Sequence, residues 1–175
     1  LAAVSFLRGD VDVAASSLEE ILRLVPDDLD AMNRTGHVHE LRGDLDEAEK
    51  AYGRVLELAD DTRDEEWRAK ACGNLGLIHQ TRGDLPEAER LYRKSLELHE
   101  KAGRKLGMAG DCGNLGLIYK TRGDLDEAER LFRKALELEQ EMDRKEGIAI
   151  QFGNLGLICK ARGDLDQAER LLHRS

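Results

Sequence analysis

The sequence predicts an all-α solenoid, a stack of antiparallel helical hairpins, and two observations carry this prediction. The first is an internal repeat. The stretch GNLGLI occurs at residues 73–78, 113–118 and 153–158, each copy 40 residues after the last. The second is that apolar residues such as Leu75 and Ile78 recur at helical spacing in two successive segments of each unit. Because one hairpin cannot bury its own apolar face, neighbouring hairpins must stack.

The repeat divides the chain into five units of one array of helical hairpins. Residues 29–68, 69–108 and 109–148 are full units, and residues 1–28 and 149–175 are partial units at the two ends. The chain is expected to start inside the first helix of one hairpin and to stop inside the second helix of another.

The tripeptide RGD is predicted to connect the two helices of each hairpin. Gly83 suits the left-handed residue just past a helix end, and Asp84 with Glu87 three residues later is typical of an N-cap with a capping box. We therefore interpret these tripeptides as turns rather than as cell-adhesion motifs. They begin at Arg42, Arg82, Arg122 and Arg162, and a further copy begins at Arg8.

Composition narrows the class of protein. The chain has 175 residues, of which 41% are hydrophobic and 36% charged, and its net charge is -9. This charge argues against nucleic acid as a ligand, because nucleic-acid binders carry an excess of basic residues. No apolar run is long enough for a membrane span, and three cysteines are too few for a disulfide framework. We expect a cytoplasmic protein without a targeting segment, a membrane partner or a nucleic-acid partner.

The order of residues within each unit resembles the tetratricopeptide repeat (TPR). Asn-Leu-Gly is followed by Gly-Asp-Leu, then by Ala-Glu, an aromatic residue and Leu-Glu-Leu, and the resemblance covers the whole chain. It implies a right-handed superhelix. The 40-residue step exceeds the usual step of about 34 and resembles the longer repeats of Pins-type spindle adaptors, kinesin light chains and bacterial TPR arrays. In the family pattern, the two helices of a hairpin approach most closely at Gly36, Gly76, Gly116 and Gly156, opposite Ala48, Ala88, Ala128 and Ala168.

A second face of each first helix is expected to be free for binding. Residues spaced by three or four positions, such as Lys70 and Asn74, lie opposite the face that carries Leu75 and Ile78. By resemblance, this face lines the concave groove in which TPR proteins hold extended peptides or partner helices. A stripe without acids in a chain of this net charge favours a partly acidic, partly apolar segment. The stripe consists of Lys70, Lys120 and Lys160 over Leu77, Leu117 and Leu157.

The resemblance also implies a ladder of asparagines that clasps the main chain of a bound peptide. The matching positions are Asn74, Asn114 and Asn154, and a carboxamide offers both donors and an acceptor for such bonds. Arg34 takes this place in the second unit, where we expect it to meet a carboxylate.

Two alternatives stay open for this face. An asparagine in this row could instead bond the neighbouring helix, and the glycines that precede the asparagines could serve close packing of adjacent first helices rather than approach of a ligand. The alternative function is a structural solenoid whose end repeats, lacking caps, self-associate end to end.

Other residues indicate packing rather than chemistry. Cys72 and Cys112 occupy positions filled by apolar residues in sister units, and His39 and His79 occupy core-edge positions. No nucleophile is paired with a base, and no phosphate loop or metal-ligand spacing is present. The sequence therefore predicts neither an enzyme nor a catalytic residue, a cofactor or a metal site.

Overall fold

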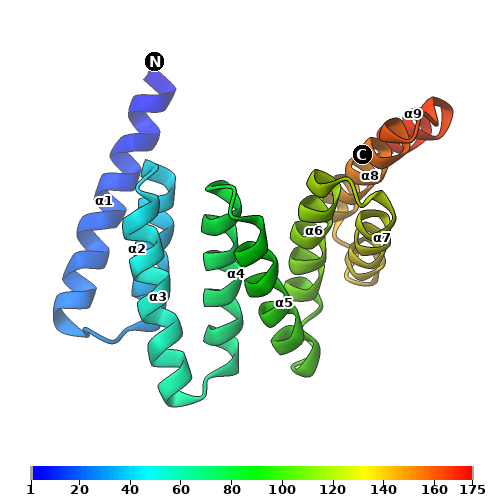
Figure 1. The fold of residues 1–175 in the computed structure, drawn as a ribbon. Coiled ribbons are helices and arrows are strands. Elements are labelled where there is room, and N and C mark those ends of the chain that lie inside the picture. The colour runs from blue at the N-terminus through cyan, green and yellow to red at the C-terminus, as the bar shows by residue number, and fades with distance from the viewer. Residues whose placement is uncertain (1, 175) are drawn as a thin grey trace. The chain divides into compact units, whose positions relative to one another are not determined.

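The computed structural model describes residues 2–174 and the side chains of residues 11–174. Over these residues the chain forms nine α-helices and no strand, which confirms the predicted all-α repeat solenoid (Figure 1). In chain order they are α1 (Ala2–Leu24), α2 (Leu29–Arg42), α3 (Leu45–Thr62), α4 (Glu65–Thr81), α5 (Leu85–Lys101), α6 (Lys105–Arg122), α7 (Leu125–Glu141), α8 (Lys145–Ala161) and α9 (Leu165–Leu172).

The chain divides into two compact units, one ending at Gly83 and the other beginning at Asp84. In the first unit, Met32, Val55 and Ala71 form a core cluster against which Trp67 packs. In the second unit, one cluster includes Tyr92, Ile118 and Leu131, and a second includes Phe132, Leu155 and Ile158. Each core therefore alternates residues of first and second helices, as stacked hairpins require.

The RGD turns have the predicted backbone conformation. The glycines that follow α2, α4, α6 and α8 have φ values between 82° and 85°, which is the left-handed region. The aspartate after each of the last three glycines caps the next helix; for example, the Asp124 carboxylate accepts a hydrogen bond from the Glu127 backbone N–H at 3.2 Å. The interpretation of these tripeptides as turns is confirmed.

The reciprocal half of the predicted capping box is absent at Asp124. Its backbone N–H donates to the carbonyl of Tyr119 at 3.0 Å, and the Glu127 carboxylate binds Arg130 instead. The physical reason is the left-handed glycine: it directs the next N–H back onto the last turn of the preceding helix, so this donor needs no side-chain acceptor.

The first RGD tripeptide does not form a turn. Residues 8–10 lie within α1, which is continuous from Ala2 to Leu24, so the helix break predicted at Arg8 is wrong. Continuing the helix costs only about 1 kcal/mol for the internal glycine.

The glycine expected at the close approach within a hairpin also leaves room for an aromatic ring in two hairpins. A Cβ atom added to Gly36 would lie 2.5 Å from Tyr52 Cε1, and one added to Gly116 would lie 2.6 Å from Phe132 Cε1. Ala48 and Ala128 are fully buried, and a Cβ atom added to Gly156 would lie 3.4 Å from the backbone oxygen of Ala168. The helices can pack closely because glycine leaves room for the ring.

This geometry separates two glycines of α6. We expect Gly116→Ala to destabilise the fold by about 1–3 kcal/mol, because the new methyl group would overlap the Phe132 ring. Gly110 has no atom within 4 Å of its Cβ position. Gly110→Ala should therefore stabilise the fold by about 0.5–1 kcal/mol through helix propensity. Urea denaturation followed by circular dichroism measures both, and equal effects of the two substitutions would contradict the packing assignment.

Candidate functional site

The first helices present one buried and one outward face. Ile78, Ile118 and Ile158 are fully buried, whereas Leu77 and Leu157 are 39% and 43% exposed. Leu117 is half-buried and packs at the edge of the Phe132 cluster. The outward face is therefore where the sequence places it, and its three leucines differ in how much surface they offer a partner.

In the first unit, the predicted binding residues already have partners within the chain. Asn74 Nδ2 donates to Asn33 Oδ1 on α2 at 2.7 Å. Lys70 pairs with Glu66 at 2.8 Å and stacks over the Trp67 ring at 4.3 Å. Here the asparagine bonds the neighbouring first helix, which is one of the two roles that the sequence left open.

Arg34 also has an intramolecular partner. Its Nε lies 2.7 Å from Asp30 Oδ2, one turn earlier on α2. The expected carboxylate is thus available from the same helix.

In the second unit, fewer of the predicted binding residues have hydrogen-bond or ion-pair partners within the chain. Asn154 Nδ2 donates to Gln151 Oε1 at 3.2 Å. Asn114, Lys120 and Lys160 make no side-chain hydrogen bond or ion pair within the part of the chain that the structure describes. These three side chains are available to a ligand without breaking an internal contact.

Two large apolar residues extend this face toward the helix starts. Leu106 is 56% exposed on α6, and Ile150 is 60% exposed on α8. The acids of these two helices are Asp111, which is buried, and Glu146, which lies in the first turn of α8. We name the set Leu106, Asn114, Leu117, Lys120, Ile150, Asn154, Leu157 and Lys160 the α6/α8 face.

A buried polar cluster joins α5 to α6 near this face. His99 Nδ1 lies 2.9 Å from Asp111 Oδ2, and Ser95 Oγ lies 3.5 Å from the same ring nitrogen. All three side chains are at least nine-tenths buried. Burial raises the pKa of Asp111, and hydrogen bonds from His99 and Ser95 oppose this rise. Since Ser95 and Asp111 share one nitrogen of His99, the cluster lacks the relay geometry of a catalytic triad.

Sequence reasoning did not find this cluster. The signal is a departure from the repeat: His99 and Asp111 stand where the first unit has Ala59 and Ala71. The ring fits because residue 107 is glycine; a Cβ atom there would lie 2.3 Å from the His99 ring. In the first unit the matching residue is Trp67, which packs against Ala71.

The next junction, between α7 and α8, has the same arrangement with different groups. Glu139 replaces His99, and its carboxylate lies over Gly147, 2.1 Å from where a Cβ atom would be. Glu139 Oε2 is buried without a hydrogen bond, and Arg144 Nε is 3.6 Å away. Gln151 stands in the place of Asp111.

Comparison with known proteins decides the family. A family model for the MalT-like TPR region matches residues 1–175, the whole chain. The chain belongs to the MalT-like TPR family. TPR arrays generally form protein-interaction or scaffold modules and are typically not catalytic. No curated protein matches this TPR chain in sequence.

Several solved structures share the fold of this TPR array. BtubC (BKLC) from P. vanneervenii is 25% identical, with a TM-score of 0.85 over 99% of this chain and 75% of that chain. A putative kinesin light chain from Podosopora anserina with nearly identical TPR-like repeats is 19% identical, with a TM-score of 0.73 over 96% and 86% of the two chains. MamA is 20% identical, with a TM-score of 0.69 over 96% and 88%.

The arginines of the RGD turns hold successive TPR hairpins together. Arg82 binds Asp46 and Glu49 on the preceding second helix, and Arg162 binds Asp126 and Glu129 in the same way. The tripeptide thus supplies a turn and an inter-repeat ion pair.

Arg122 has one carboxylate of this kind, Glu89, because Pro86 occupies the position of the second. Tyr119 also donates to Glu89 at 2.5 Å. Burial would raise the pKa of Glu89, but hydrogen bonds from Tyr119, Arg122 and Arg93 outweigh it and lower the pKa to about 2.

The cysteines and core-edge histidines of the TPR array are packed as expected. Cys72 and Cys112 are fully buried, and burial raises the pKa of the Cys112 thiol to about 11. His79 is half-buried, with Nε2 at 3.5 Å from Glu49 Oε1. None of the described helices combines the length and apolar character of a membrane span.

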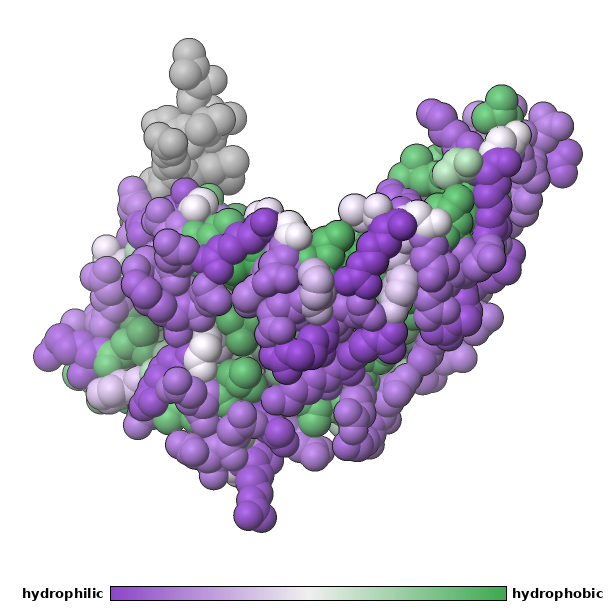
Figure 2. Space-filling model, in the orientation of Figure 1, coloured by the Kyte–Doolittle hydropathy of each residue, from purple (hydrophilic) through white to green (hydrophobic). Residues whose placement is uncertain are grey.

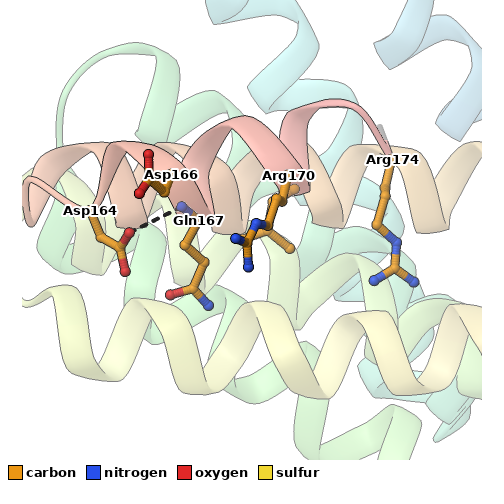
Figure 3. Close-up of a pocket in the computed structure, with 6 residues that line it drawn as sticks. Asp164, Asp166, Gln167, Arg170 and Arg174 are labelled. Atoms are coloured by element: carbon orange, nitrogen blue, oxygen red, sulfur yellow. Dashed lines mark hydrogen bonds between the residues drawn. The ribbon is translucent and has the colours of Figure 1, made fainter.

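The hollows of the second unit are open and shallow. Figure 3 shows one of about 500 Å³ along α9, with Asp164 and Asp166 at one end and Arg170 and Arg174 at the other. Arg174 stacks over the Phe152 ring at 4.1 Å. This hollow brings together no nucleophile and base, so it offers no catalytic arrangement.

Proposed function

We propose that this TPR array is a protein-interaction module that binds an extended, partly acidic and partly apolar segment of a partner protein on the outward faces of its first helices. The observation that carries the proposal is the α6/α8 face. On this face Lys120 and Lys160 form no ion pair with any residue that the structure describes, and they lie beside exposed apolar side chains in a chain of net charge -9. Most of the surface in Figure 2 is hydrophilic, with hydrophobic areas scattered over it.

The side chains of the α6/α8 face favour a partner segment with acidic and apolar residues. Two lysines without carboxylates favour acidic residues, and they steer such a segment toward the face at low ionic strength. Leu157 and Ile150 offer area for apolar side chains. Asn114 offers two donors and one acceptor to the main chain of an extended peptide.

The three asparagines are not equivalent in this proposal. Asn114 has its whole amide available, whereas Asn74 is bonded to Asn33 and Asn154 to Gln151. A ligand bond to Asn114 replaces water, but a bond to the donor of Asn74 must first displace an internal acceptor. Asn114 therefore contributes most to peptide binding.

An exhaustive peptide array tests the proposal. Arrayed peptides carry aspartate and leucine in every combination of positions, and a matching lysine and leucine array is the control. The labelled chain should bind peptides of the acidic array and not those of the basic one. Lys120→Glu with Lys160→Glu should reverse this preference, and Asn114→Ala should weaken binding by about 5–10-fold, since one hydrogen bond contributes about 1 kcal/mol.

Two variants control for indirect effects. Lys94→Glu makes one such Lys-to-Glu change on the second helix α5 and is compared with each single lysine variant, and Asn74→Ala removes an asparagine that already has an internal partner; both should retain binding. Equal binding to the two arrays, or loss with Lys94→Glu as large as with either single lysine variant, would overturn the proposal.

Self-association is a second candidate, favoured by the apolar side of α9. Leu165 is 65% exposed, and Leu165, Ala168 and Leu172 line an open hollow of about 520 Å³. Sedimentation over a range of concentrations tests it. A mass that rises with concentration and falls back in Leu165→Glu would support an assembly, and a constant monomer mass would exclude it.

A further inference from the structure

Helix α6 contains four glycines at intervals of three residues: Gly107, Gly110, Gly113 and Gly116. Each costs about 1 kcal/mol of helix stability relative to alanine. Two of them make room for core side chains, as Gly107 does for His99 and Gly116 for Phe132. Gly113 faces the next first helix instead: its Cβ position lies 3.5 Å from Gln151 Nε2 on α8.

The Gln151 side chain is held at one end and unsatisfied at the other. It is 6% exposed, and its Oε1 accepts a hydrogen bond from Asn154. Its Nε2 has no acceptor among the described residues, yet it is not among the polar atoms sealed from solvent. The Nε2 group of Gln151 can therefore donate a hydrogen bond to a ligand that lies between α6 and α8.

We propose that Gln151 is the residue of α8 that donates to a main-chain carbonyl of a bound peptide, and that Asn154 is a positioning residue that holds the Gln151 amide in the donating orientation. This rests on the proposed function of the α6/α8 face and changes its geometry. On α8 the residue that donates the hydrogen bond to the ligand is Gln151, which lies one helical turn before Asn154. Its Nε2 lies next to Gly113, which has no side chain.

The equivalent positions explain why this donor is specific to α8. On α6 the matching residue is Asp111, which is an acceptor already bonded to His99, and on α4 it is Ala71. A ligand carbonyl can therefore meet a donor of this kind on α8 and not on α4 or α6. Such a difference fixes the register of a peptide on otherwise near-identical repeats.

The test uses the tightest-binding peptide of the acidic array and a double-mutant cycle. Gln151→Ala should weaken binding about 5–10-fold, as expected for one hydrogen bond of about 1 kcal/mol. Asn154→Ala should weaken it by a similar factor alone and by no further factor in the Gln151→Ala background. Asn154→Asp should also weaken binding, because a carboxylate accepts from Gln151 Nε2 and removes the donor. Gln140→Ala, an exposed glutamine on α7, is the control and should bind as the unmodified chain does.

A measurement on the free protein gives an independent readout. The side-chain N–H groups of Gln151 should exchange with solvent quickly in the free chain and slowly with peptide bound, as followed by nuclear magnetic resonance. Slow exchange in the free chain that is abolished by Glu139→Ala would show that Glu139 is the acceptor, and it would overturn this inference.

The outcomes separate the two proposals. Loss of binding in Asn114→Ala with full binding in Gln151→Ala would leave the proposed function standing and overturn the role of Gln151. Additive losses in the double variant would overturn the positioning role of Asn154. Absence of any acidic array peptide that binds would overturn both proposals.

Discussion

Replacing His99 by alanine should destabilise the fold by about 1–3 kcal/mol or more, the cost of leaving the buried Asp111 carboxyl without its main hydrogen-bond partner. The substitution leaves Asp111 95% buried, with Ser95 as its remaining hydrogen-bonding neighbour in the cluster. Urea denaturation measures the loss. His173→Ala is the control, because it removes an exposed histidine at the end of α9. Its free energy of unfolding should stay within about 0.5 kcal/mol of that of the unmodified chain.

The pH dependence of this loss follows from the pKa of Asp111. Burial raises that pKa in the folded state, so the folded chain holds this proton more readily than the unfolded chain does. The ionised carboxylate therefore lowers the stability of the fold above the folded pKa, and this loss vanishes as pH falls to the ordinary pKa of an aspartate. Without His99 the carboxyl has lost its main partner, and the penalty of His99→Ala should shrink on acidification. A loss below about 1 kcal/mol at neutral pH, or one that grows in acid, would contradict the assignment.

The second large effect on stability is expected when the residues of the junction between α5 and α6 are replaced by those of the junction between α3 and α4. Gly107→Trp alone should destabilise the fold by at least about 3 kcal/mol, because even a Cβ atom at residue 107 would overlap the His99 ring. Adding Ser95→Val, His99→Ala and Asp111→Ala reproduces the residues of the first unit: Val55, Ala59, Trp67 and Ala71. The fourfold variant should regain or exceed the original stability, since apolar residues of similar volume often replace a buried polar pair without loss.

Thermal and urea unfolding of the single and fourfold variants test this exchange. The pH dependence of stability that Asp111 causes should also disappear in the fourfold variant. If the fourfold variant were as unstable as Gly107→Trp alone, the two junctions would not be interchangeable. The fit between the side chains of residues 99 and 107 would then not determine the packing of α5 against α6.

Much of the fold could be predicted because its signals are local. The RGD turns need only a glycine in the left-handed region and an aspartate that caps the next helix, and both lie within a few residues of each other. The same tripeptide at Arg8 lies inside α1, so the local motif alone does not determine whether the helix ends there.

The two faces of the first helices were also predictable, for a geometric reason. Residues 75 and 78 lie on one side of a helix and residue 77 on another, so burial of Ile78 and exposure of Leu77 follow from the helical period. The candidate binding residues Asn114, Lys120 and Lys160 could be named on this basis. Their lack of internal partners could not, because it depends on which side chains the neighbouring helices bring close.

The sequence by itself therefore determined the repeat, the hairpins, the turns and the outward stripe, all of which depend on spacing along one helix or across one turn. Tertiary structure alone decided the partners of side chains that meet between helices. It paired Asn74 with Asn33, His99 with Asp111 and Gln151 with Asn154, and it left one end of the Gln151 amide without an acceptor. The physical reason is that a hydrogen bond between helices depends on differences in distance of a few tenths of an ångström and on the space that a facing glycine leaves. Residue spacing along the sequence predicts neither quantity.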